Sequence, residues 1–199
     1  MTQATAKESD AELKTRYGPF RLIAFEFPSG SAHAALVKGD LSAVEHPLVR
    51  VQSACLTATA LGAVGCDCAD QMDEALRLVS DAGAGLVLYL DQEGMGHGLV
   101  EKVLHFREIN RGADTYEAAL RRGVDPDVRD YAETAIILRE LIGDRSIRLL
   151  TNNPEKEARL QQVGVTIWDS LPIESEPTEA NRGYLQAKKL KLHHRLTKV

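Results

Sequence analysis

Residues Cys55 to Asp70 read CLTATALGAVGCDCAD and contain all three cysteines of the chain, Cys55, Cys66 and Cys68. One residue separates Cys66 from Cys68, so an extended or turning backbone brings their side chains to one point. Cys55 lies ten intervening residues away and returns to that point through a loop or a short helical turn. Converging thiolates suit a soft or borderline cation, and Zn²⁺ is the commonest in a cytosolic protein.

An odd number of cysteines argues against a disulfide framework, because one thiol would be left over. Three protein ligands also leave the fourth tetrahedral position open, which is typical of catalytic rather than structural zinc. The alternative is three buried cysteines that behave as small apolar residues. The clustering and the spacing favour a metal site formed by Cys55, Cys66 and Cys68.

The composition excludes several classes of protein. The chain has 199 residues, 44% of them hydrophobic and 27% charged, which is typical of a soluble protein with a substantial core. No apolar run approaches the ~20 residues of a membrane helix. The N-terminal stretch MTQATAKESDAELKTRYG is polar and of mixed charge, unlike a signal peptide. Reduced thiols then predict the cytoplasm, and a net charge of −5 argues against a nucleic-acid partner.

We expect one domain over residues 19–194, preceded by a loosely held, flexible arm at 1–18 and followed by a tail at 195–199. The basic run KKLKLHHRL, from Lys188 to Leu196, is interpreted as a solvated helix end with cations near the C-terminal pole of the helix dipole.

The apolar pattern changes partway along the chain. Three closely spaced strands, at 20–27, 33–38 and 47–53, predict a mainly antiparallel sheet or partial barrel in the first part. Helices and strands then alternate, which implies α/β layering. The helices are expected at 70–81, 99–110, 114–122, 131–141, around Lys156 and at 184–191, and the strands at 86–90, 146–150 and 165–168. The predicted fold class is α/β (α+β), a mixed sheet with antiparallel N-terminal strands and flanking helices.

Three of the predicted strands end in polar or glycine-rich loops, at Cys55, at 91–98 (DQEGMGHG) and at 151–153 (TNN). Ligands in layered α/β proteins bind beyond the carboxyl ends of strands, so these loops are candidates for an active surface. The glycines either let backbone approach a ligand or only make a tight turn. Glu93 is either a general base or a cap for the next helix.

Two further pairs of residues are candidates for the same site. Asp127 and Arg129 flank Val128, so both side chains point the same way in extended backbone, although such a pair is usually only a surface salt bridge. Thr151 and Lys156 straddle a helix start, where backbone N–H groups favour an anion.

Taken together and in their order along the chain, these motifs resemble those of the GTP cyclohydrolase II family. The resemblance extends from about Tyr17 to His194. The family's zinc segment, roughly HSECLTGD…RCDCG, appears here as QSACLTAT…GCDCA from Gln52 to Ala69, and its RQEGRGIGL loop appears as DQEGMGHGL from Asp91 to Leu99. Further matches are Gln71, GADT at 112–115 with Glu117, DVRDY at 127–131, LLTNNP at 149–154 with Lys156, Tyr184–Leu185 and Lys188.

The resemblance implies a zinc-dependent cyclohydrolase of riboflavin biosynthesis, in which activated water attacks C8 of the purine of GTP, opens the ring and releases formate. Asp127 matches the proton acceptor. Arg129 matches the nucleophile toward the α-phosphate, although electrostatic stabilisation is physically easier for a protonated guanidinium. Mg²⁺ would accompany the triphosphate, and the family is typically a homodimer. The implied substrate contacts are Arg50, Ser53, Gln71, Glu93, Gly94, Met95, Thr115, Thr151 and Lys156.

The chain departs from the family within these motifs. Gln52 and Ala54 replace His and Glu, Ala58–Thr59 replaces Gly-Asp, and arginines are replaced by Gly65, Asp91 and Met95. Phe106 stands where the family has a tyrosine close to the purine. This pattern suggests metal chemistry retained on an altered substrate. Three hypotheses remain: GTP cyclohydrolase II activity, hydrolysis of a less phosphorylated purine or of a pyrimidine such as a uracil or uridine nucleotide, and a non-catalytic zinc-stabilised nucleotide-binding protein.

Overall fold

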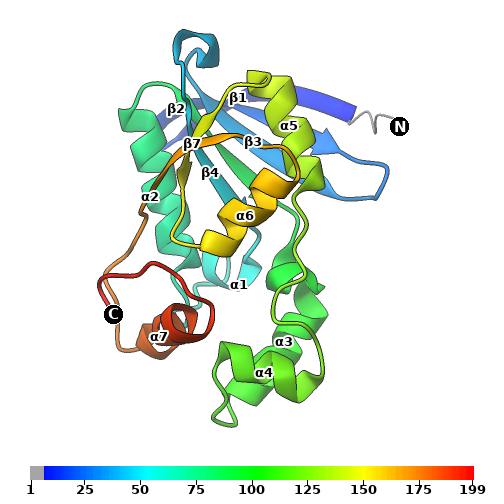
Figure 1. The fold of residues 1–199 in the computed structure, drawn as a ribbon, viewed down its shortest axis with the longest axis vertical. Helices are drawn as coiled ribbons and strands as arrows, with labels where there is room; N and C mark the ends of the chain where they lie inside the picture. Colours follow the sequence, from blue (N-terminus) through cyan, green and yellow to red (C-terminus); the bar gives the residue numbers. More distant parts are fainter. Residues whose placement is uncertain (1–6) are drawn as a thin grey trace.

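The computed structural model describes residues 7–199 as a seven-stranded sheet with helices on both faces (Figure 1). The strands are β1 (Lys7–Thr15), β2 (Gly18–Glu26), β3 (Ala32–Lys38), β4 (Leu48–Ser53), β5 (Gly85–Leu90), β6 (Ile147–Leu150) and β7 (Ile167–Leu171). The helices are α1 (Leu56–Thr59), α2 (Cys68–Asp81), α3 (Gly98–Ile109), α4 (Thr115–Arg122), α5 (Ala132–Ile142), α6 (Pro154–Gln162) and α7 (Arg182–Lys191), with short 3-10 turns η1 (Leu41–Ala43) and η2 (Glu93–Gly96). The predicted α/β class is confirmed.

The sheet joins an antiparallel half to a parallel half. Its strand order is β1-β2-β3-β5-β4-β6-β7, in which β1, β2, β3 and β5 pair antiparallel and β5, β4, β6 and β7 pair parallel. The sequence predicted that β4 would belong to the antiparallel part, and this was wrong. β5 lies between β3 and β4 because its run of apolar residues, buried on both faces, suits the centre of a sheet.

Two apolar clusters hold the layers together. On one face, Phe25, Val49 and Leu88 pack with Ile137 of α5 and Leu160 of α6. On the other face, Phe20, Leu36, Leu48 and Val87 pack with Ala75 and Val79 of α2. Helices α3, α4 and α7 lie beyond the edge of the sheet, on the side where β4 and β5 end (Figure 1). In the described part of the chain, no helix is long and apolar enough to cross a membrane.

Two predictions about the ends of the chain need correction. Residues 1–6 of the expected flexible arm lie outside the described residues, but Lys7–Thr15 is not loosely held, because it forms β1 and pairs with β2 from Lys7↔Glu26 to Thr15↔Gly18. An edge strand is held by its backbone ladder, so its charged side chains gave no apolar pattern to read. At the other end, the basic run does end helix α7, with Lys188, Lys189 and Lys191 in its last turn, but it is not fully solvated, since Lys188 and Leu196 are both buried.

Candidate active site

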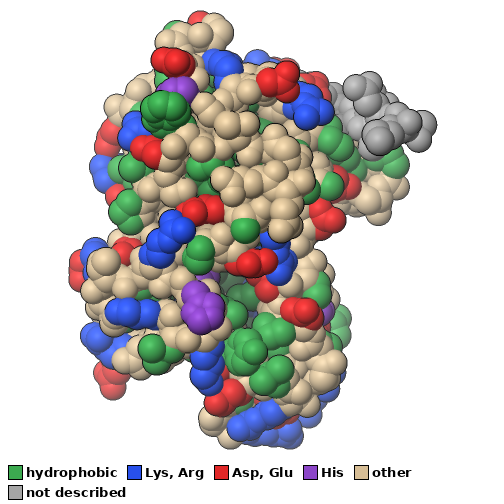
Figure 2. Space-filling view, viewed as in Figure 1, with side chains coloured by type: hydrophobic (Ala, Val, Ile, Leu, Met, Phe, Trp, Pro, Cys, Tyr) green, Lys and Arg blue, Asp and Glu red, His purple; other side chains and the backbone are tan. Residues whose placement is uncertain are grey.

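Loops at the carboxyl ends of β4, β5 and β6 surround a cavity of about 820 Å³. In the space-filling view a hollow opens between the parts drawn below the sheet, with histidine side chains at its rim (Figure 2). The volume lies within the range of small-molecule sites. Every predicted site residue lines this one cavity: Arg50, Ser53, Cys55, Cys66, Cys68, Gln71, Glu93, Gly94, Met95, Thr115, Asp127, Arg129, Thr151 and Lys156.

The three thiols converge as their spacing predicted. Their sulfur atoms lie within 4.8 Å of one another, and Cys55 Sγ is 3.8 Å from Cys66 Sγ. Cys55 directly precedes α1, which turns the chain back, and Cys68 begins α2. Hydrogen bonds from the thiols of Cys66 and Cys68, and the ammonium of Lys102 at 3.0 Å, hold the pKa of Cys55 well below its ordinary value.

This donor set fits a metal ion. Two sulfurs bound to tetrahedral zinc at about 2.3 Å stand ~3.8 Å apart, which matches the spacing of Cys55 and Cys66. No other group of three or more metal-ligating side chains occurs in the part of the chain that the structure describes. The three cysteines therefore form a group that could hold a metal ion at the wall of the cavity.

A buried ion pair fixes the loop between the last two thiols. Asp67, which separates Cys66 from Cys68, is 2% exposed and lies 3.1 Å from the Nζ of Lys188 on α7. The second oxygen of Asp67 accepts a hydrogen bond from the side-chain amide of Gln71 at 2.6 Å. Burial raises the pKa of Asp67, but the Lys188 ammonium outweighs that effect and keeps the pKa below its usual value. The carboxylate is therefore ionised, and it links α7 to the metal site.

Four cationic side chains line the cavity: Arg50, Lys156 and Lys188, which are buried, and Arg129, which is 13% exposed. Arg129 and Lys188 pair with Asp127 and Asp67. In the described structure the hydrogen bonds of the other two go to neutral oxygens. Arg50 bonds to the side chains of Gln52 and Gln71 and to the carbonyl of Leu150, and Lys156 bonds to the carbonyl of Val51.

The cationic side chains around the cavity lower the pKa values of neighbouring basic groups. Burial, and then repulsion by Arg50, Arg129 and Lys188, lowers the pKa of Lys156 well below its ordinary value. Burial and the same kind of repulsion lower the pKa of His194, in the segment after α7, to about 3. The repulsion among these groups indicates that the cavity suits an anion, whose negative charge would raise the pKa of Lys156 again.

Asp127 and Arg129 form the ion pair that their spacing predicted. Nε of Arg129 lies 2.8 Å from Oδ1 of Asp127, and NH2 lies 2.5 Å from Oδ2, so the contact is bidentate. Burial opposes the charge on both groups. The Asp127 carboxylate nevertheless raises the pKa of Arg129, and the guanidinium lowers that of Asp127. Arg129 is thus protonated and Asp127 is ionised. The pair is largely shielded from water and bidentate, so it is not the surface salt bridge that such a spacing usually gives.

The glycine-rich loop holds this pair from one side. The N–H of Val128 donates to the carbonyl of Met95 at 3.2 Å. Gly96 has φ +94°, and a Cβ there would stand 3.1 Å from Cγ2 of Val128 and 3.2 Å from the backbone N of Arg129. Gly96 therefore serves a close approach between two loops of the site, rather than only a tight turn.

Glu93 does not cap the helix that follows it. Its Oε1 accepts from Lys102 at 2.6 Å and its Oε2 accepts from the N–H of Leu56 at 2.6 Å, so the carboxylate ties η2 to α1 beside Cys55.

Other predicted contacts are hydroxyl side chains. Ser53 lies 3.5 Å from a guanidinium nitrogen of Arg129. Thr115 begins α4, and Thr151 receives the N–H of Asn153.

The substituted positions divide into two groups. Gly65, Met95 and Phe106 line the cavity, as the resemblance implied. Asp91 does not line it, and its backbone N–H instead donates to His33 Nδ1 at 3.0 Å. Asp91 therefore does not contribute a carboxylate to the cavity wall.

Sequence reasoning missed several polar residues of this cavity. Lys102, His194 and Arg159 line it without having been assigned to the site, and Lys188 was noted only as a family match inside a run interpreted as solvated. One sequence signal was available: Asp67 lies between two expected metal ligands, and an aspartate buried there calls for a cation from elsewhere in the chain.

The fold and the cavity together define a class: an α/β protein in which a cluster of three thiols that could hold a metal ion shares a cavity with several cationic side chains. The family model described as GTP cyclohydrolase II matches residues 6–172. The chain belongs to the GTP cyclohydrolase II family.

Curated relatives agree with this assignment. The chain is 44% identical over 191 residues to "Riboflavin biosynthesis protein RibBA" of Endomicrobium trichonymphae, covering 96% of this chain and 47% of the relative. It is 41% identical over 198 residues to the RibBA of Bacillus subtilis, covering 98% of this chain and 50% of that one. The chain thus spans about half the length of these relatives.

A solved structure of RibBX from A. baumannii, titled a two domain 3,4-dihydroxy-2-butanone 4-phosphate synthase, matches with a TM-score of 0.45 and 17% identity. The match covers 88% of this chain and 42% of that one. A likeness at this level establishes nothing about the site.

Proposed function

We propose that this chain is a zinc-dependent cyclohydrolase that opens the heterocyclic ring of GTP or a closely related nucleotide, in riboflavin biosynthesis. The observation that carries the proposal is the meeting, in one cavity, of the three thiols, the Asp127–Arg129 pair and the two buried cations without carboxylate partners. Membership of the GTP cyclohydrolase II family supports the same reaction.

In this proposal the cationic side chains bind the phosphate groups of the substrate. Arg50, Lys156 and Arg129 would neutralise the phosphates, and the approaching anion would raise the lowered pKa of Lys156. Arg129 stays protonated beside Asp127, so it acts on the α-phosphate by electrostatic stabilisation rather than as a nucleophile. Magnesium accompanying the triphosphate, and a homodimer, are part of the proposal.

Cys55, Cys66 and Cys68 would hold the zinc ion. When bound, the ion supplies the Lewis acidity that activates water near neutral pH. Asp127 is ionised and lies at the wall of the same cavity, so it can accept a proton during attack on the ring. Glu93 and Lys102 fix the position of α1 and the charge beside Cys55.

A second candidate is a substrate with fewer phosphates or with a pyrimidine ring. Gly65 and Met95 line the cavity where the family has arginines, and Phe106 lines it without the hydroxyl of a tyrosine, which favours this candidate. A screen of purine and pyrimidine nucleotides, followed by ultraviolet difference spectra and mass spectrometry, separates the two. The non-catalytic alternative predicts nucleotide binding without any new product.

A further inference from the structure

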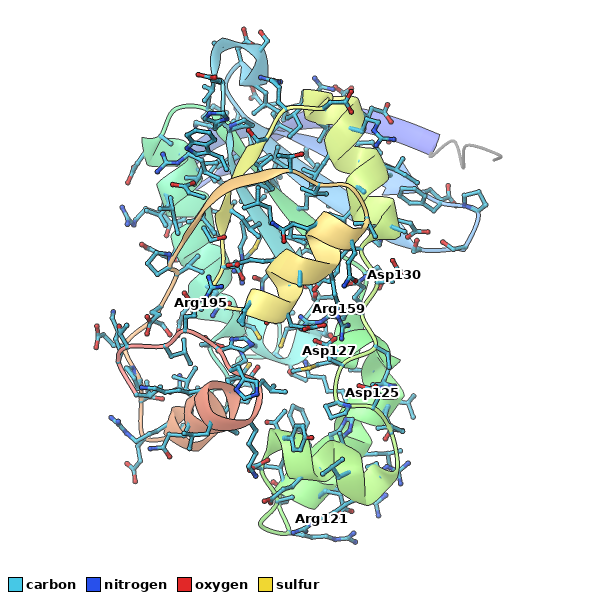
Figure 3. All side chains as sticks on the ribbon, viewed as in Figure 1. Arg121, Asp125, Asp127, Asp130, Arg159 and Arg195 are labelled. Atoms are coloured by element: carbon cyan, nitrogen blue, oxygen red, sulfur yellow. The ribbon has the colours of Figure 1, made fainter. Side chains whose placement is uncertain are left out.

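Arg159 on α6 lies beside the segment that bears Asp127 and Arg129 (Figure 3). Its NH1 donates to the carbonyl of Asp127 at 3.2 Å and to the carbonyl of Arg129 at 3.1 Å. The same nitrogen lies 3.6 Å from the carboxylate of Asp127. One guanidinium therefore contacts the backbone of both residues and the side chain of one.

The segment runs between α4 and α5 without regular secondary structure from Asp125 to Asp130. The N–H groups of Asp127 and Arg129 donate to the side chains of Asp125 and Asp127. The glycine-rich loop contacts both ends of the segment, through His97 at the carbonyl of Asp125 and through Gln92 at the carbonyl of Asp130. On the side opposite Arg159, the Met95 carbonyl accepts from Val128, and Gly96 lies against the backbone of Arg129. The Val128 side chain is 45% exposed and adds little packing. Residues 127–129 are thus held between the glycine-rich loop and a single side chain of α6.

We infer that Arg159 is a positioning residue, which holds Asp127 and Arg129 extended so that both side chains face the cavity. The inference rests on the proposed function of that pair. On this inference α6 contributes to the site twice: its first turn supplies Lys156, and Arg159 in the next turn orients the Asp127–Arg129 ion pair. Both carbonyls accept from the same nitrogen, NH1, whose two N–H bonds point in fixed directions in the plane of the guanidinium, whereas the ammonium of a lysine rotates freely.

Arg159 also acts on Asp127 through its charge. Its guanidinium contributes, after burial and the contacts with Arg129, to the pKa of Asp127, and its contribution lowers that pKa. If Asp127 must be ionised to accept a proton, activity is lost as the pH falls through the pKa of Asp127. Removing Arg159 raises that pKa, so the acid limb of the profile should move to higher pH. This charge effect is separable from the backbone effect, because a lysine keeps the charge.

The test compares Arg159→Leu and Arg159→Lys with Arg77→Leu, which removes an arginine on α2 that pairs with Glu74 and Asp81 away from the site. Hydrogen exchange of the backbone amides at 127–129 is the readout that needs no activity. We expect the amides at 127–129 to exchange about tenfold faster in Arg159→Leu than in wild type. Arg159→Lys should show most of this acceleration, and Arg77→Leu should show none. Zinc content and thermal midpoint should stay at the wild-type values in all three variants.

Enzyme kinetics supply the second readout. We expect kcat to fall at least tenfold in Arg159→Leu with little change in KM, and its acid limb to move up in pH, whereas Arg159→Lys should keep the limb near the wild-type position. Unchanged exchange at 127–129 in Arg159→Leu would overturn the inference. If the wild-type protein hydrolyses no nucleotide, the proposed function fails, and hydrogen exchange alone decides the role of Arg159.

Discussion

The ammonium of Lys102 lies 3.0 Å from Sγ of Cys55 and 2.6 Å from Oε1 of Glu93. A cation in contact with a thiolate offsets part of its negative charge and fixes its orientation. It also links the sulfur to the carboxylate that anchors α1. The metal site is therefore supported from α3 as well as from the loop that carries the cysteines.

Replacing Lys102 by methionine should weaken zinc binding by about tenfold or more, because partners of metal ligands typically contribute 10–100-fold in affinity. Lys102→Arg keeps a cation and should lose less. Competition with a chromophoric chelator measures both affinities. Equal zinc affinity in wild type and Lys102→Met would show that the contact with Cys55 does not matter for the metal.

Replacing Lys188 by methionine leaves Asp67 buried without its cation. Breaking a buried ion pair on one side costs about 3–5 kcal/mol, so the free energy of unfolding should fall by roughly that amount. Lys191→Met is the matched control, since its ion pairs with Asp114 and Glu117 are half-exposed, are screened by water and should contribute far less to the free energy of unfolding. Denaturant unfolding of both variants checks this. Similar losses in the two would contradict the importance of the Asp67 contact.

The structure explains why some elements could be predicted and others could not. Apolar periodicity identified β2, β3, β5 and α2, because burial sets those patterns. The same signal failed for β1, which has charged side chains and is held by backbone pairing. The last strand, expected at 165–168, runs from Ile167 to Leu171 because buried Val165 packs in the core before the strand begins.

The site divides in the same way. Motif spacing predicted that the three cysteines converge and that Asp127 and Arg129 point the same way, and the structure brings both sets together, since their members lie close in the sequence. Motif spacing did not find Lys102 or Lys188, whose partners Cys55 and Asp67 lie 47 and 121 residues away. Long-range ion pairs leave no local pattern, so only the folded structure brings these residues to the metal site.

Variants of Asp127 and Arg129 separate the proposed proton acceptance by Asp127 from the proposed action of Arg129 on the α-phosphate. Arg129→Ala should abolish turnover while zinc content stays at the wild-type level, because the guanidinium lies at the cavity wall and does not touch the thiols. Asp127→Asn should reduce kcat strongly with little effect on nucleotide affinity. Steady-state kinetics and binding titrations measure the two effects. Wild-type rates in both variants would exclude the family mechanism for this chain.

GTP should be a poor or incompletely converted substrate. Gly65 and Met95 line the cavity in place of arginines, and one lost charged contact weakens binding by roughly tenfold or more. The cations that remain, Arg50, Arg129 and Lys156, should still bind phosphate. Kinetics with GTP should score formate, pyrophosphate and the pyrimidine product separately. Equal amounts of all three, with kcat/KM of ~10⁴ M⁻¹s⁻¹ or above, would show that these substitutions do not alter the substrate.

The most direct test of the central claim, a zinc ion held by three thiols for ring opening, is to measure zinc content and formate release on the same samples of wild type and Cys66→Ser, across the nucleotides of the screen. We predict about one zinc per wild-type chain, with formate released from at least one nucleotide. Cys66→Ser should lose most of the zinc and all formate release. Full zinc occupancy with undiminished formate release in Cys66→Ser would contradict the claim.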